Sequence, residues 1–139
     1  MPDGAARIGD FGLTGCTVLL VEDEYLMANA LSQILRAAGA TVLGPAATTD
    51  RALRLRERTD RIDAAVLDIN LRGETVYGLA DVLRERAVPF LFTTGYIASM
   101  IPPRYQGHDI LHKPLDTTDL LRVLVGLTCR SKNTTDPVR

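Results

Sequence analysis

The sequence has little of what marks several classes of protein. Two cysteines, Cys16 and Cys129, are too few for a disulfide framework, so a reducing cytoplasm is the expected location. The longest apolar runs fall far short of the roughly 20 residues of a membrane-spanning helix. The first 15 residues lack the basic and then apolar pattern of a signal peptide. A formal net charge of -1 gives no basic surface for nucleic acid. We therefore expect a cytoplasmic protein that binds neither DNA nor membranes.

Glycine-rich phosphate loops of the GxxxxGK or GxGxxG type are also absent, which argues against a nucleotide-binding enzyme. The composition that remains, 46% hydrophobic and 24% charged, is typical of a globular protein, and 139 residues suffice for one domain with its own core. We expect a flexible leader over residues 1–15, a folded domain over residues 16–127 and a polar tail over residues 128–139.

Short apolar runs alternate with longer amphipathic stretches along the folded part of the chain. The expected strands are residues 16–21, 41–46, 63–67, 88–92 and 109–112. The expected helices are residues 24–38, 51–58, 76–87 and 116–127. Pro102 and Pro103 leave room for a shortened helix of one or two turns before the last strand. This alternation predicts an α/β fold, a doubly wound parallel sheet of five strands with helices on both faces.

Reactive side chains follow four of the five expected strands. Glu22 and Asp23 follow the first strand, Asp68 the third, Thr94 the fourth and Lys113 the fifth. Because the carboxyl ends of parallel strands lie along one edge of a sheet, we expect these side chains to converge. Three carboxylates in one place repel each other, and Mg²⁺ relieves that repulsion with the oxygen ligands that it prefers. A carboxylate can then attack phosphorus and form an acyl phosphate, while a lysine stabilises the phosphoryl charge.

Each of these segments also has an ordinary structural explanation. Acidic residues such as Glu22 and Asp23 are favoured before a helix by its dipole. Asp68 can begin a loop, Thr94 a turn, and Lys113 can lie in a surface dipeptide. Their joint position at the ends of four strands favours one shared site over these separate explanations.

The order of these residues resembles the CheY-like receiver domains of bacterial two-component response regulators. VLLVEDE resembles the acidic strand end of that family, AAVLDINL the phosphoacceptor strand, FTTGY the strand with the switch hydroxyl, and LHKP the lysine–proline segment. The resemblance covers about residues 16–127. It implies a flavodoxin-like fold with strand order 2-1-3-4-5.

The resemblance implies how Asp68 would react. Asp68 would be the phosphoacceptor, and its donor would be a histidine kinase or a histidine phosphotransfer protein. Lys113 would pair with the phosphoryl group, and Thr94 would turn its hydroxyl toward it as the switch. The bond between Lys113 and Pro114 is often cis in the family.

The resemblance also implies a metal site and a function. Glu22, Asp23, Asp68 and the backbone carbonyl of Asn70 would hold Mg²⁺. The chain would be a stand-alone signalling switch, not an enzyme beyond its own phosphorylation and dephosphorylation. It would switch protein–protein interactions with an unknown downstream protein, or act as a phosphate shuttle or sink, and phosphorylation-dependent homodimers remain open.

Two other functions compete with this interpretation. A pseudo-receiver would keep the fold as a pure interaction module, although no residue of the pocket is missing. An aspartate-nucleophile phosphatase would need a second acid two residues after Asp68, where the sequence has Asn70.

The sequence departs from the family pattern in three places. Ile110 stands where many receivers have Tyr or Phe, so the usual coupling between that ring and the switch threonine cannot operate. Residues 71–73, Leu-Arg-Gly, replace the proline often found soon after the phosphoacceptor. TTGY and the shortened fourth helix resemble an alphaproteobacterial subgroup named for its FATGUY motif, which lacks the switch aromatic.

Overall fold

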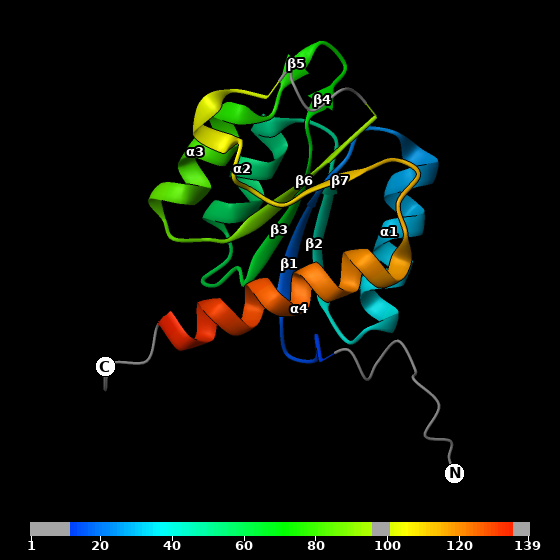
Figure 1. The fold of residues 1–139 in the computed structure, drawn as a ribbon, viewed down its shortest axis with the longest axis vertical. Coiled ribbons are helices and arrows are strands. Elements are labelled where there is room, and N and C mark those ends of the chain that lie inside the picture. Colours follow the sequence, from blue (N-terminus) through cyan, green and yellow to red (C-terminus); the bar gives the residue numbers. More distant parts are fainter. Residues whose placement is uncertain (1–11, 96–100, 135–139) are drawn as a thin grey trace.

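A computed structural model describes residues 12–95 and 101–134, and within them five parallel strands form one sheet (Figure 1). The strands are β1 (Thr17–Val21), β2 (Thr41–Ala46), β3 (Ala64–Asp68), β6 (Phe90–Thr94) and β7 (Ile110–His112). Their order across the sheet is β2-β1-β3-β6-β7. This confirms the expected five-stranded α/β fold and the strand order that the family resemblance implies.

Helices cover both faces of the sheet and divide the core into two layers. The helices are α1 (Tyr25–Ala37), α2 (Thr49–Glu57), α3 (Tyr77–Glu85) and α4 (Thr117–Thr134). Successive side chains of a strand point to opposite faces. Leu19 and Val21 of β1 therefore join the core beneath α2 and α3, whereas Val18 and Leu20 join the core beneath α1 and α4. Strands buried on both faces explain why the apolar runs in the sequence are continuous.

The expected strands and the first three helices lie within two residues of the observed ones, but the last helix is longer than expected. The pattern placed its end at residue 127, and α4 continues to Thr134. Thr128 is buried, and its hydroxyl donates a hydrogen bond of 3.1 Å to the carbonyl of Val125. The buried side of the helix thus extends beyond Leu127 to Thr128, which the sequence pattern does not mark as buried because it is polar. Residues 128–134, which we expected to belong to a polar tail, thus continue this helix.

Two short elements complete the described chain. A hairpin of β4 (Asn70–Leu71) and β5 (Glu74–Thr75) follows β3 and was not expected, because strands of two residues carry no periodic signal. Among the described residues between β6 and β7, only Pro103–Tyr105 is helical, as a single 3-10 turn. The turn agrees with the shortened helix that the two prolines predicted.

The turn at Pro103–Tyr105 is held against α3 by a polar contact in an aromatic core. The Tyr105 ring is fully buried and lies 5.3 Å from the ring of Phe92 and 6.0 Å from that of Tyr77. Its hydroxyl donates to the carboxylate of Asp81, and Arg104 donates to both oxygens of that carboxylate at 3.0 and 3.1 Å. The hydrogen bonds from Arg104 and Tyr105 lower the pKa of Asp81.

We expect Tyr105→Phe to destabilise the folded protein at pH 7 by about 1 kcal/mol, the usual contribution of one hydrogen bond. Because the pKa of Asp81 is lower in the folded than in the unfolded chain, its stabilising contribution is complete above its unfolded pKa. It is lost as the pH falls through the folded pKa. The difference in the free energy of unfolding between Tyr105→Phe and the unmodified protein should therefore narrow below about pH 4. Urea unfolding across pH measures it, and a loss that is constant with pH would contradict the role of Asp81.

Candidate functional site

The acidic residues of the sequence motifs meet at the carboxyl ends of β1 and β3. Val21 pairs with Leu67 in the parallel register, so Glu22 and Asp68 continue the two strands at the same level. Carboxylate oxygens of Glu22, Asp23 and Asp68 all lie within 4.8 Å of one another. Glu22 and Asp68 are buried, and Asp23 is partly exposed. Three carboxylates thus share one pocket at the edge of the sheet, as their places in the sequence indicated.

Lys113 brings a positive charge into this pocket from the end of β7. Its Nζ lies 3.0 Å from Oε1 of Glu22 and 3.2 Å from Oδ2 of Asp68. Its backbone N–H donates to the carbonyl of Thr94, and the bond between Lys113 and Pro114 is cis. Partial burial by itself lowers the pKa of Lys113, but the hydrogen bond to Glu22 and the charges of Asp68 and Glu22 raise it above its usual value. Lys113 therefore remains a cation throughout the physiological pH range.

Glu22 shows that one lysine does not fully compensate the cluster. Burial raises the pKa of Glu22, and the nearby charge of Asp68 raises it further. Hydrogen bonds from the Glu24 N–H at 3.1 Å and from Lys113 oppose this rise without cancelling it. The ionised form of Glu22 is therefore disfavoured in the folded protein, and an additional positive charge would relieve it.

The remaining predicted residues lie on the strands and turn around Asp68. Asn70 begins β4, and its N–H donates a hydrogen bond of 3.2 Å to Oδ1 of Asp68. Thr94 is buried at the end of β6, one residue beyond Thr93, which pairs with Asp68. Ile110 begins β7 and packs against the core beneath α3. Tyr96, the last residue of the FTTGY motif, lies outside the described residues.

Arg72 also belongs to this site, although no motif in the sequence predicts a role for it. Its Nε lies 3.3 Å from Oδ2 of Asp23, the one carboxylate of the cluster for which no contact with Lys113 is seen. Sequence reasoning could not place it there, because the contact depends on the hairpin of β4 and β5. The only signal in the sequence was the departure from the family pattern at residues 71–73.

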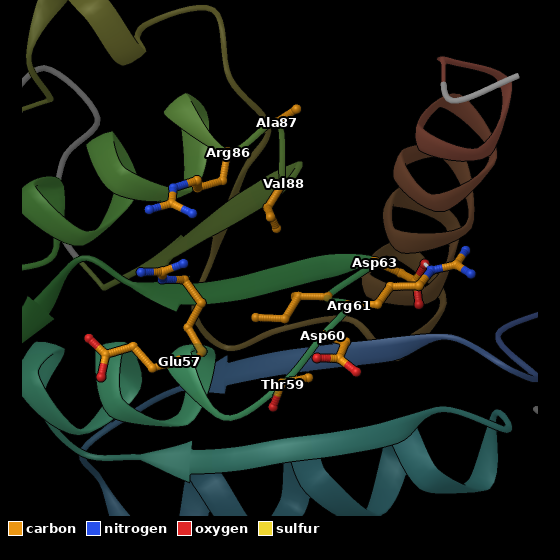
Figure 2. A pocket seen from close by; sticks show the side chains of 10 residues that line it. Glu57, Thr59, Asp60, Arg61, Asp63, Arg86, Ala87 and Val88 are labelled. Atoms are coloured by element: carbon orange, nitrogen blue, oxygen red, sulfur yellow. Dashed lines mark hydrogen bonds and ion pairs between the residues drawn. The ribbon is translucent and has the colours of Figure 1, made fainter. Parts of the chain in front are cut away.

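A second hollow lies at the opposite, amino edge of the sheet and contains none of the predicted site residues. It has a volume of about 980 Å³ and is lined by Arg56, Glu57, Thr59, Asp60, Arg61, Ile62, Asp63, Arg86, Ala87 and Val88. Figure 2 shows Arg61 beside Asp63, and the two side chains form an ion pair of 2.7 Å. Asp63 also accepts a hydrogen bond of 2.8 Å from the N–H of Thr17. Arginines and acids are mixed along this hollow, so its charge indicates no particular ligand.

The donor set of the acidic pocket fits a hard divalent cation. All candidate ligand atoms are oxygens, and three of them come from carboxylates that are already close together. Lys113 and Arg72 supply two positive charges against three negative ones, so the cluster keeps a net negative charge that attracts a cation. The residues present are therefore those that Mg²⁺ would use.

Comparison with known proteins agrees with this geometry. The family model of the response regulator receiver domain matches residues 18–125. The chain belongs to the response regulator receiver domain family, the phosphoacceptor modules of two-component systems. No curated protein sequence matches it. No helix in the described part of the chain is long and apolar enough to cross a membrane.

Solved structures place the chain among the same proteins. The solution structure of SdrG from Sphingomonas melonis Fr1 is 35% identical, covers 81% of this chain and 95% of its own, and superimposes with a TM-score of 0.71. A putative response regulator from Chloroflexus aurantiacus J-10-fl is 30% identical, covers 83% and 98% of the two chains, and has a TM-score of 0.72. Membership of the FATGUY subgroup stays a prediction.

We expect Mg²⁺ to stabilise the folded protein through the acidic pocket. At a concentration about a hundred times its Kd, a ligand of the folded state alone adds about 2.7 kcal/mol to the free energy of unfolding. Asp23→Asn should lose most of this gain, because it removes one charged ligand. Asp119→Asn, which changes an exposed carboxylate of α4, should keep it. Urea unfolding with Mg²⁺ or EDTA measures both, and equal gains in the two variants would contradict the assignment of Asp23.

Proposed function

We propose that the chain is a signalling switch that takes a phosphoryl group onto Asp68 in a Mg²⁺-dependent reaction. The donor would be a histidine kinase or a histidine phosphotransfer protein. The observation that carries this proposal is the position of Lys113, whose ammonium contacts both Asp68 and Glu22 inside a cluster of three carboxylates. A lysine in that place can pair with the Asp68 carboxylate before the reaction and with a phosphoryl oxygen after it.

The contacts of Asp68 prepare its carboxylate for attack. The Asn70 N–H holds one oxygen and Lys113 holds the other, so the group is fixed in orientation. In the reaction a bond forms between an Asp68 oxygen and phosphorus, and the bond between phosphorus and the histidine nitrogen of the donor breaks. Mg²⁺, when bound, supplies charge that offsets the phosphoryl oxygens. Glu22, Asp23, Asp68 and the carbonyl of Asn70 would hold it.

Thr94 is the residue proposed to respond to the phosphoryl charge on Asp68. It ends β6 beside Asp68 and would turn its hydroxyl toward the phosphoryl group. Ile110 offers no ring to follow that movement, so the response must pass through other contacts of β6 and β7. The output would be a change in binding to another protein, or transfer of the phosphoryl group onward.

Two exposed apolar side chains support a protein as the phosphoryl donor. Tyr25 and Leu26 are 78% and 72% exposed at the start of α1, and Tyr25 stands two residues after Asp23 of the pocket. Large apolar side chains that lie together in solvent are typical of interaction surfaces. We propose that the donor docks here, which would bring its histidine to the pocket.

Asp68→Asn should take up no phosphoryl group from acetyl phosphate and Mg²⁺, because the amide is not a nucleophile. Asp50→Asn, a change at an exposed carboxylate of α2, should be phosphorylated like the unmodified protein. Mass spectrometry of the intact protein measures the product. Phosphorylation that persists in Asp68→Asn would exclude Asp68 as the acceptor.

Docking at the start of α1 can be separated from the chemistry. Tyr25→Ala and Leu26→Ala should slow phosphoryl transfer from a cognate histidine kinase and leave the reaction with acetyl phosphate unchanged, because a small donor needs no docking surface. Rates that fall equally with both donors would mean that the substitutions damage the pocket rather than a docking surface.

A further inference from the structure

The tip of the hairpin that follows Asp68 carries an arginine in an unusual backbone conformation. Asn70 pairs with Thr75 and Leu71 with Glu74, so Arg72 and Gly73 form a two-residue loop. Their φ angles are 53° and 91°, and both lie in the left-handed region. Such loops favour Asn, Asp or Gly in the first position, because other side chains are strained there. The turn itself does not explain the arginine, and such a conformation at a site points to function.

The hairpin is attached to the body of the domain on both of its strands. Leu71 is buried in the core. Glu74 accepts hydrogen bonds from the N–H and the hydroxyl of Thr49 at the start of α2, at 3.0 and 3.1 Å. These attachments fix the loop at the mouth of the acidic pocket, so the side chain of Arg72 is held within reach of it.

The contact between Arg72 and Asp23 is the part of the pocket most easily exchanged. The Arg72 side chain is 81% exposed, whereas that of Asp23 is 11% exposed. Because the guanidinium lies mostly in solvent, it can leave at small cost once another cation pairs with Asp23. Lys113 is different, because it is largely enclosed and contacts two carboxylates at once. Asp23 thus has a removable counter-charge, and Glu22 and Asp68 have a fixed one.

We propose that Arg72 exchanges partners during the reaction and contacts the phosphoryl group directly. It pairs with Asp23 while the pocket lacks a divalent cation, and it turns to the phosphoryl oxygens once a cation has taken that carboxylate. The inference rests on the proposed function. A guanidinium suits this second partner because its planar set of N–H groups matches the oxygens of a phosphoryl group.

The charges of the pocket are consistent with this exchange. Three carboxylates and two side-chain cations leave one negative charge. A divalent cation reverses the sign and repels the guanidinium from Asp23. Conversion of the Asp68 carboxylate to an acyl phosphate then adds one negative charge. The phosphorylated pocket is neutral only when Arg72 is counted, which favours its return as a phosphoryl contact.

Three variants test the exchange. Arg72→Asn removes the guanidinium and keeps the hairpin, because asparagine accepts the left-handed conformation. Arg72→Lys keeps the charge. Arg122→Gln removes an exposed arginine of α4, whose partner Asp119 lies 3.9 Å away, and serves as the control. Calorimetric titration with Mg²⁺ measures affinity without any reaction, and acetyl phosphate at saturating Mg²⁺ measures the rate of phosphorylation.

Arg72→Asn should bind Mg²⁺ tighter by roughly two- to fivefold, since the guanidinium that competes for Asp23 is gone. It should also be phosphorylated more slowly at saturating Mg²⁺. Arg72→Lys should stay close to the unmodified protein in affinity, and the control should match it in both measurements. Unchanged or weaker Mg²⁺ binding by Arg72→Asn would overturn the competition, and an unchanged rate would overturn the phosphoryl contact.

Failure of the proposed function would look different from failure of this inference. An unmodified protein that binds no Mg²⁺, or that is not phosphorylated on Asp68, would refute the function and the inference with it. Normal binding and phosphorylation of the unmodified protein, together with an Arg72→Asn variant that behaves identically, would refute the role of Arg72 alone.

Discussion

The repulsion among three carboxylates at one edge of the sheet is the constraint on which the pocket depends. Glu22 and Asp68 are buried, and burial of like charges is unfavourable unless cations are placed among them. Lys113, at the end of β7, places one positive charge beside Glu22, and Arg72, in the hairpin, places a second beside Asp23. The compensation stays incomplete, which is why the pocket can accept a further cation. A fully neutralised pocket would be more stable and would have no use for an ion.

Much of the fold followed from the sequence, because a parallel sheet buried on both faces leaves continuous apolar runs. The residues of β1 form such a run, and every one after Thr17 is buried. The end of α4 was misplaced because Thr128 satisfies its hydroxyl on the helix backbone and is buried nonetheless. The hairpin of β4 and β5 was not expected, because its strands are too short for a periodic pattern and its loop has Arg72 before Gly73, where Asn or Asp is usual.

The site was predictable to the extent that it lies at strand ends. Glu22, Asp68 and Lys113 converge because parallel strands end together, and topology alone brings them to one edge. Contacts that depend on turns were out of reach. Two contacts depend on the path of the chain after β3, which the hydrophobic periodicity of the sequence does not predict. They are the hydrogen bond from the Asn70 N–H to Asp68 and the ion pair of Arg72 with Asp23.

The contact between Thr17 and Asp63 at the far edge of the sheet has a consequence for the pocket. Two hydrogen bonds join the residues: the Asp63 carboxylate accepts from the Thr17 N–H, and the Asp63 N–H donates to the Thr17 carbonyl. These two hydrogen bonds fix the register of β1 against β3 at the end of the strands opposite the acidic pocket. A slip of one residue would displace Glu22 from Asp68 by about 3.3 Å and turn it to the other face. Residues remote from the chemistry thereby govern how closely the acids approach.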